Sequence, residues 1–142
     1  MISRIFIDSS VLFTAANSAK GHSRDLMLMS AAGKVTLILS NFVLEETRRN
    51  LASTRTGLTV LHRIIQEARI EVISVTNQQV RRAVRLIVPK DAPILAAAKA
   101  AKVDMLVSLD NKHILGRPEL ENYFNALILT PIELFAKLKE QS

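Results

Sequence analysis

Apolar, β-branched stretches alternate with helix-like stretches along the whole chain, and this alternation constrains the fold more than any other feature. The stretches that predict strands are residues 2–7, 35–39, 70–75, 104–109 and 126–129. The stretches that predict helices are residues 11–19, 23–32, 41–52, 59–68, 77–88, 91–102 and 131–139. Strands that alternate with helices are typical of a parallel sheet covered on both faces. The sequence therefore predicts one α/β domain over residues 1–142, with a central, mainly parallel sheet of about five strands.

The composition excludes several other classes of protein. A chain of 142 residues that is 49% hydrophobic can bury a core, which a disordered tail cannot. The absence of cysteine excludes a disulfide-stapled module and a cysteine-ligated metal site. We find neither an apolar run of the roughly 18 residues that a membrane span needs nor a signal-peptide layout, so we expect a cytoplasmic protein with no membrane partner. The net charge of +6 is compatible with an anionic partner, most commonly RNA or DNA.

Several carboxylates are predicted to meet at the sheet edge where parallel strands end, which is where such folds bind ligands. Asp8 and Asp110 each follow a predicted strand, and Asp91 opens the helix that leads into the fourth strand. Glu45 and Glu46 lie in the first turns of the helix after the second strand. Clustered carboxylates repel one another and select a hard cation such as Mg²⁺ or Mn²⁺. Such an ion activates water and stabilises a phosphodiester under attack, so the pattern predicts metal-dependent phosphoryl hydrolysis.

Each acid also has a purely structural interpretation. Asp91 begins the tripeptide Asp-Ala-Pro, which suits a helix N-cap. Asp8 and Asp110 suit capping or turn positions, and Glu45 is placed to pair with Arg49 one helical turn later. The histidines are expected to be surface or packing residues and not metal ligands: His22, His62 and His113.

Three segments resemble the PIN domain family, which includes the VapC-like toxin ribonucleases. They are IFIDSSVLFTAA, SNFVLEETRRNL and KDAPILAAAKAAKVDMLVSLDNKHIL, and the resemblance spans nearly the whole chain. It implies a Rossmann-like α/β/α sandwich and an acidic quartet, which carries over onto Asp8, Glu46, Asp91 and Asp110. Glu46 is preferred to Glu45 because the family's glutamate usually precedes a hydrophobic residue by five places, here Leu51.

The resemblance also implies an activity and partners. It indicates an Mg²⁺- or Mn²⁺-dependent endoribonuclease, in which Asp8, Asp91 and Asp110 hold one metal ion. Glu46 then positions or deprotonates the attacking water. Many members are toxins that a small antitoxin protein inhibits, and many are homodimers.

Basic and polar residues near the predicted acids are candidates for binding RNA. They are Ser10, Arg48, Lys90, Asn111 and Lys112. Many family members carry an acid or an asparagine where this chain has Lys112, and Asn111 is a candidate to replace that missing ligand. Ser10 stands where the family often has Asn or Thr, and it can still bind a carboxylate.

Three other functions remain open from the sequence. The departure at Lys112 favours a PIN fold with a weakened site, which would act as an RNA-binding or scaffold module. A haloacid-dehalogenase-like phosphatase also ends its first strand in an aspartate, but it needs Asp-x-Asp where this chain has Asp8, Ser9 and Ser10. A flavodoxin-like receiver would need an aspartate after the third strand, where residues 74–76 are Ser, Val and Thr.

Overall fold

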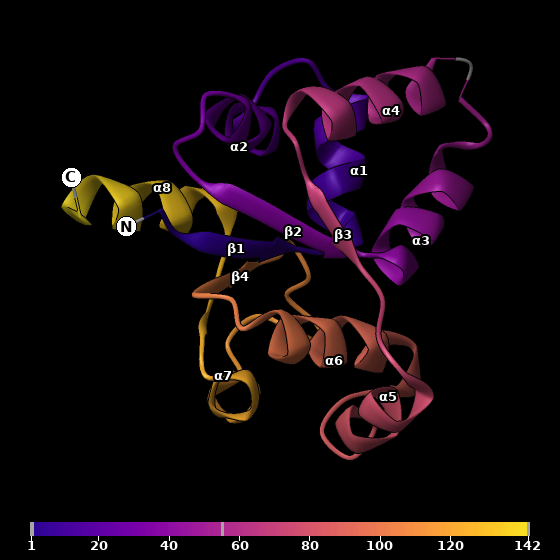
Figure 1. Ribbon diagram of the computed structural model, residues 1–142, viewed down its shortest axis with the longest axis vertical. Helices are drawn as coiled ribbons and strands as arrows, with labels where there is room; N and C mark the ends of the chain where they lie inside the picture. Colours follow the sequence, from indigo (N-terminus) through magenta and orange to yellow (C-terminus); the bar gives the residue numbers. More distant parts are fainter. Residues whose placement is uncertain (1, 55, 142) are drawn as a thin grey trace.

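Five parallel strands form one sheet in the order β3-β2-β1-β4-β5 (Figure 1). The structure is a computed structural model that describes residues 2–54 and 56–141. The strands are β1 (Arg4–Ile7), β2 (Thr36–Ser40), β3 (Glu71–Ile73), β4 (Met105–Val107) and β5 (Leu127–Leu129). Each of them falls within or overlaps a stretch that the sequence predicts as a strand. The predicted α/β class and the five-stranded parallel sheet are therefore confirmed.

Helices cover both faces of this sheet, as nearly continuous apolar strands require. In Figure 1, α1 (Ser9–Asn17), α2 (His22–Ala31), α3 (Asn41–Leu51) and α4 (Gly57–Glu67) lie on one side. On the other side lie α5 (Asn77–Ala83), α6 (Ala92–Ala101) and α7 (Pro118–Phe124). The last helix, α8 (Pro131–Gln141), follows β5 and contacts α2.

The hydrophobic core lies between these layers. Ile5 of β1 pairs with Leu37 on one side and with Met105 on the other. Ile5 and Leu37 have no exposed surface, and Met105 is buried too. Helix α6 buries every residue from Ile94 to Ala98, because its alanines allow the helix to pack close to its neighbours.

The helix predicted over residues 77–88 is shorter than expected. Helix α5 ends at Ala83, and residues 84–86 form turns. Pro89 keeps Val88 out of a helix, because the residue before a proline is driven out of helical backbone angles. Val88 accordingly has φ −54° and ψ 143°, and a short 3₁₀ helix (Pro89–Asp91) follows it.

The order of the strands creates a switch point between β1 and β4. The chain builds outward from β1 through β2 to β3, and it then returns to place β4 on the other side of β1. A crevice outside the strand ends at such a point is the usual ligand site of open α/β sheets. Asp8 directly follows β1, and Ser108 directly follows β4.

Two acids lie at the opposite edge of the sheet, where the strands begin, and both have structural partners. Asp104 accepts a hydrogen bond from the Arg4 N–H at 2.8 Å. Glu71 forms an ion pair with the Arg4 guanidinium at 3.5 Å. These carboxylates secure the start of the strands and take no part in the site. Within the described ranges, no helix is both long and apolar enough to cross a bilayer.

The burial of a strand side chain predicts how strongly its replacement by alanine destabilises the fold. Leu106 in β4 has no exposed surface, whereas Leu127 in the neighbouring β5 is 42% exposed. Leu106→Ala should lower the free energy of unfolding by about 2–5 kcal/mol, because it leaves a cavity in the core. Leu127→Ala, the matched control, should cost less than about 1 kcal/mol. Urea denaturation measures both, and equal losses would contradict this description of the core.

Candidate metal centre

The four predicted acids come from four elements that converge at the ends of β1 and β4. Asp8 precedes α1, and Glu46 lies on α3. Asp91 closes the 3₁₀ helix before α6, and Asp110 begins the loop after β4. The charges of Asp110 and Glu46 both act on Asp91, and the charge of Asp110 acts on Asp8. The structure thus brings together residues that lie up to 102 positions apart in the sequence.

Asp8 is the most deeply buried of the four, with 2% of its surface exposed. Its Oδ1 accepts hydrogen bonds from the Ser10 hydroxyl at 2.5 Å and from the Val11 N–H at 3.2 Å. The Val11 bond is an N-cap of α1, so the predicted capping role is confirmed. Its Oδ2 accepts from the Ser108 hydroxyl. Burial raises the pKa of Asp8 against the opposing effect of these hydrogen bonds.

Two serine hydroxyls connect Asp8 to the loop that carries Asp110. The Ser10 hydroxyl, which donates to Asp8, accepts from the Leu109 N–H at 3.1 Å. The Ser108 hydroxyl, which also donates to Asp8, accepts from the Asp110 N–H at 2.9 Å. Each serine hydroxyl therefore bridges the Asp8 carboxylate and a backbone N–H group just beyond β4. Ser108 was not among the residues that the sequence singled out.

Asp110 is held by the loop that it begins. Its Oδ1 accepts from the backbone N–H groups of Lys112 at 2.9 Å and of His113 at 3.1 Å. Burial alone would raise the pKa of Asp110, but these hydrogen bonds and the nearby imidazole outweigh it and hold the pKa below its ordinary value. Asp110 thus has the turn-forming role that its position allowed, while its Oδ2 faces the His113 ring.

Asp91 lacks the capping partner that its sequence suggested. Asp91 occupies the N-cap position of α6, as the sequence predicts, but its side chain makes no cap hydrogen bond. The side chain is only 8% exposed, and its Oδ2 is buried without any hydrogen-bond partner. Burial raises the pKa of Asp91 despite the opposing charge of Lys90, and the charges of Asp110 and Glu46 raise it further. A buried carboxylate oxygen in this state favours a cation nearby.

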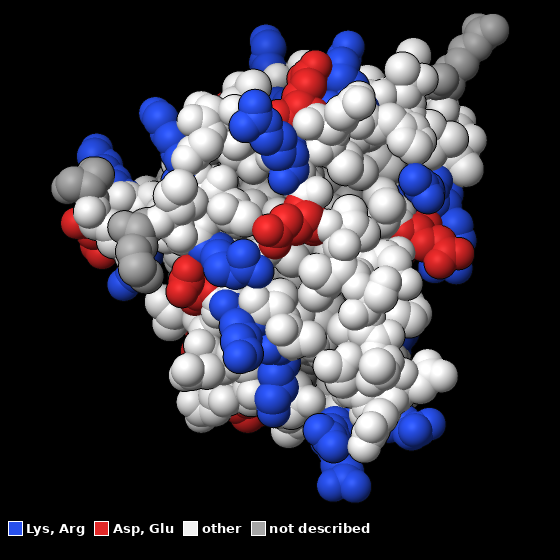
Figure 2. Space-filling view, viewed as in Figure 1, with Lys and Arg blue, Asp and Glu red and all other residues white. Residues whose placement is uncertain are grey.

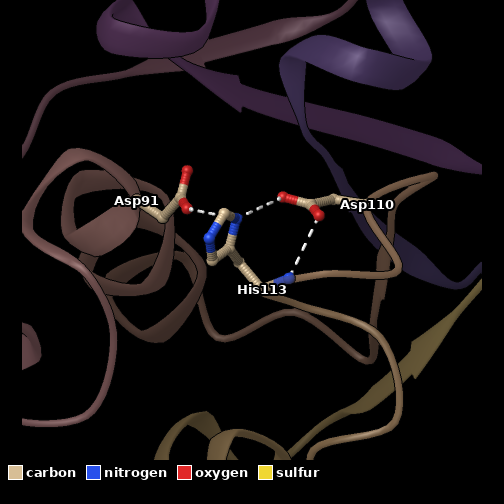
Figure 3. Close-up of side chains that lie close together, drawn as sticks. All are labelled: Asp91, Asp110 and His113. Carbon is tan, nitrogen blue, oxygen red and sulfur yellow. Dashed lines mark hydrogen bonds and ion pairs between the residues drawn. The ribbon is translucent and has the colours of Figure 1, made fainter.

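His113 lies between Asp91 and Asp110, which the sequence did not predict (Figure 3). Its Nδ1 is 3.6 Å from Oδ2 of Asp91 and 3.4 Å from Oδ2 of Asp110. One possible ligand atom from each of the three residues lies within 4.8 Å of the others. Asp8 is outside this trio. The only signal in the sequence was that His113 is three residues beyond Asp110, a spacing that a tight turn brings together.

The structure also separates the two adjacent glutamates on α3. Glu46 is partly buried and accepts a hydrogen bond from the Ser9 hydroxyl, whereas Glu45 is exposed. Glu46 lines a small cleft together with Arg49 and Lys90. The geometry therefore supports the same choice between them that the family resemblance made.

The candidate RNA-binding residues lie around this centre in different settings. Lys90 shares the cleft with Glu46, while Arg48 is exposed on α3. Lys112 is exposed and contributes its backbone N–H to Asp110. Asn111 lines a separate pocket of about 360 Å³. Ser10 binds Asp8, as anticipated, and so it is a support of the site.

Basic side chains predominate on the face seen in Figure 2, in keeping with the net charge. Acidic and basic side chains lie side by side over α3, at the right of this view. Further basic side chains extend from α5 at the bottom, where Arg81 and Arg82 lie in the last turn.

Comparison with known proteins assigns a family. The sequence profile of the PIN domain matches residues 4–112, which include Asp8, Glu46, Asp91 and Asp110. No curated protein matches the chain significantly.

Solved structures share the fold at low sequence identity. VapBC2 from Rickettsia felis, bound to a DNA fragment from its promoter, is 17% identical with a TM-score of 0.64, covering 88% of this chain and 96% of its own. VapC20 from Mycobacterium tuberculosis, a toxin that cleaves the sarcin-ricin loop, is 19% identical with a TM-score of 0.58, covering 76% and 91%. PAE2754 from Pyrobaculum aerophilum is 17% identical with a TM-score of 0.63, covering 96% and 98%. With its sheet, its acidic cluster and a profile match over most of its length, this chain belongs to the PIN domain family.

Proposed function

We propose that this protein is a metal-dependent endoribonuclease whose centre is formed by Asp8, Glu46, Asp91 and Asp110. One observation carries the proposal. Asp91 has a buried oxygen without a hydrogen-bond partner, and it lies beside a second carboxylate at the switch point of the sheet. A divalent cation satisfies such an oxygen, and carboxylate oxygens are ligands that Mg²⁺ and Mn²⁺ accept.

The residues present fit such an ion, and each has a proposed role. Asp91 and Asp110 would hold it, and Asp8, which the sequence predicts as a third ligand, would support them through the serine hydroxyls that it binds. A bound ion would supply Lewis acidity at the scissile phosphate and would lower the pKa of a coordinated water. Glu46 is available to orient the attacking water and accept its proton, because its carboxylate is partly solvated and the Ser9 hydroxyl fixes its position.

The basic residues are proposed to attract the RNA backbone. Lys90 lies in the cleft beside Glu46, and Arg48 lies on the same helix as Glu46. Cations at the rim of an acidic centre offset its repulsion of phosphate. Asn111 and Lys112 follow Asp110 directly, and we propose that they contact the RNA beside the metal site.

An antitoxin partner and a homodimer are further parts of the proposal. The VapBC2 structure, whose fold resembles this one, is bound to a DNA fragment from its promoter. By analogy, we propose that a small antitoxin protein inhibits this chain. The substrate of this chain is proposed to be RNA, by analogy with the structural neighbour that cleaves the sarcin-ricin loop.

The two glutamates of α3 allow a matched test of the catalytic role. We expect Glu46→Gln to slow RNA cleavage by about 10²–10⁴-fold, because it removes the general base. Glu45→Gln removes the same charge from an exposed neighbour and should leave the rate within about twofold of that of the unmodified protein. The assay incubates each variant with total cellular RNA and Mn²⁺ and maps new 5′ ends by sequencing. Equal losses in the two variants would contradict the role of Glu46, and RNA binding without cleavage by the unmodified protein would favour a non-catalytic module.

The buried charge of Asp91 predicts a dependence of stability on pH. Burial raises the pKa of Asp91 in the folded state, so its ionisation destabilises the fold. This penalty is absent below the ordinary pKa of 3.8, grows as the pH rises towards the folded pKa, and persists above it. In EDTA at pH 7, Asp91→Asn should therefore raise Tm by about 2–5 °C, and the gain should vanish below pH 4. Differential scanning calorimetry measures both values.

A divalent cation should make the unmodified protein more stable than Asp91→Asn, the reverse of their order in EDTA. Mn²⁺ should raise the Tm of the unmodified protein, because it binds only the folded state. It should leave the Tm of Asp91→Asn nearly unchanged. If Mn²⁺ stabilised both proteins equally, Asp91 would not be a ligand.

A further inference from the structure

The position of His113 is fixed by its backbone. Its N–H donates to Asp110, and its carbonyl accepts from the Arg117 guanidinium at 3.1 Å. The same guanidinium donates to the Leu86 carbonyl at 2.8 Å, which ties the loop to the segment that follows α5. The imidazole is therefore held beside both acids by the loop itself.

The distances around Nδ1 are long for direct hydrogen bonds. They are 3.4 Å to Asp110 and 3.6 Å to Asp91, whereas good N–H···O bonds measure about 2.7–3.2 Å. Ligand atoms that surround one ion at about 2.1 Å lie about 3.0 Å apart in octahedral geometry and about 3.4 Å apart in tetrahedral geometry. The separations around Nδ1 match those of atoms that share an ion better than those of atoms bonded to each other.

The electrostatics of the trio also require a positive centre. A bare nitrogen lone pair that faces two carboxylate oxygens is repelled by both, so either a proton or a cation must lie between them. The Asp91 oxygen that faces Nδ1 is buried and accepts no hydrogen bond. The nitrogen and this oxygen thus face each other at 3.6 Å, and a metal ion between them would satisfy both when the imidazole is neutral.

We propose that His113 Nδ1 is a direct ligand of the divalent cation, alongside Asp91 and Asp110. The inference rests on the proposed metal-dependent function and goes further, because it assigns a nitrogen donor to a centre that the acids alone would make all-oxygen. Imidazole binds first-row transition-metal ions well, whereas Mg²⁺ prefers oxygen ligands and water. His113 therefore biases the centre towards Mn²⁺ and related ions over Mg²⁺.

Pulsed EPR of Mn²⁺ bound to the full chain tests this coordination without any turnover. A directly bound imidazole gives ¹⁴N modulation of the Mn²⁺ signal. We expect this modulation in the unmodified protein, and we expect protein labelled with ¹⁵N-histidine to replace it with the ¹⁵N pattern. Because the labelling changes no residue, this result does not depend on whether a variant folds.

Variants of all three histidines identify the ligand. His113→Ala should abolish the ¹⁴N modulation, while His62→Ala on the exposed face of α4 and His22→Ala at the start of α2 should retain it. Titration should show that His113→Ala lowers the affinity for Mn²⁺ relative to Mg²⁺ by about tenfold. Circular dichroism confirms that each variant is folded.

The outcomes separate this inference from the proposed function. Mn²⁺-dependent RNA cleavage without histidine nitrogen coupling would overturn the role of His113 and leave the nuclease intact. Retention of the coupling in His113→Ala would overturn it as well. Failure of the unmodified protein to bind Mn²⁺ at all would overturn both.

Discussion

A buried carboxylate at the switch point organises the whole centre. Asp8 ends the central strand β1, caps α1, and accepts hydrogen bonds from Ser10 and Ser108. Those two hydroxyls in turn hold the N–H groups of Leu109 and Asp110. One carboxylate thereby aligns the end of β1, the start of α1 and the loop after β4. The energetic penalty of burying Asp8 is partly offset by hydrogen bonds that also place its neighbours.

The positive net charge of the chain contrasts with the acidic character of this centre. The chain has 19 Lys and Arg against 13 Asp and Glu, but two of its acids are buried at the same edge of the sheet: Asp8 and Asp91. Burial raises the pKa of both, and the surrounding protein compensates them only partly. These clustered negative charges favour the binding of a cation at this site, although the net charge of the chain is positive. The surplus of Lys and Arg provides the attraction that phosphate needs near an acidic centre.

Much of the fold and part of the centre could be predicted from the sequence. The ends of buried parallel strands are visible as apolar runs, so the placement of Asp8 and Asp110 at one edge followed from topology. The choice of Glu46 needed either the family resemblance or the structure, because adjacent residues on a helix look alike in a sequence. Pro89 sets the end of the helical pattern in the sequence at Val88, but α5 ends earlier, at Ala83.

The remaining features depend on tertiary contacts that no local pattern records. Ser108 looks like the continuation of a strand until its hydroxyl is seen to bridge Asp8 and Asp110. His113 looks like a lone histidine until the turn after Asp110 folds it back between two acids. The capping hydrogen bond expected at Asp91 is absent for the same reason, since its carboxylate faces the centre and not its own helix.

The central claim is that this edge of the sheet holds a divalent cation. A crystal soaked in Mn²⁺, with anomalous diffraction recorded at the manganese absorption edge, tests it most directly. The account predicts a strong anomalous peak bounded by the Asp91 and Asp110 carboxylates. The absence of a peak there, or a peak confined to other surface carboxylates, would contradict it.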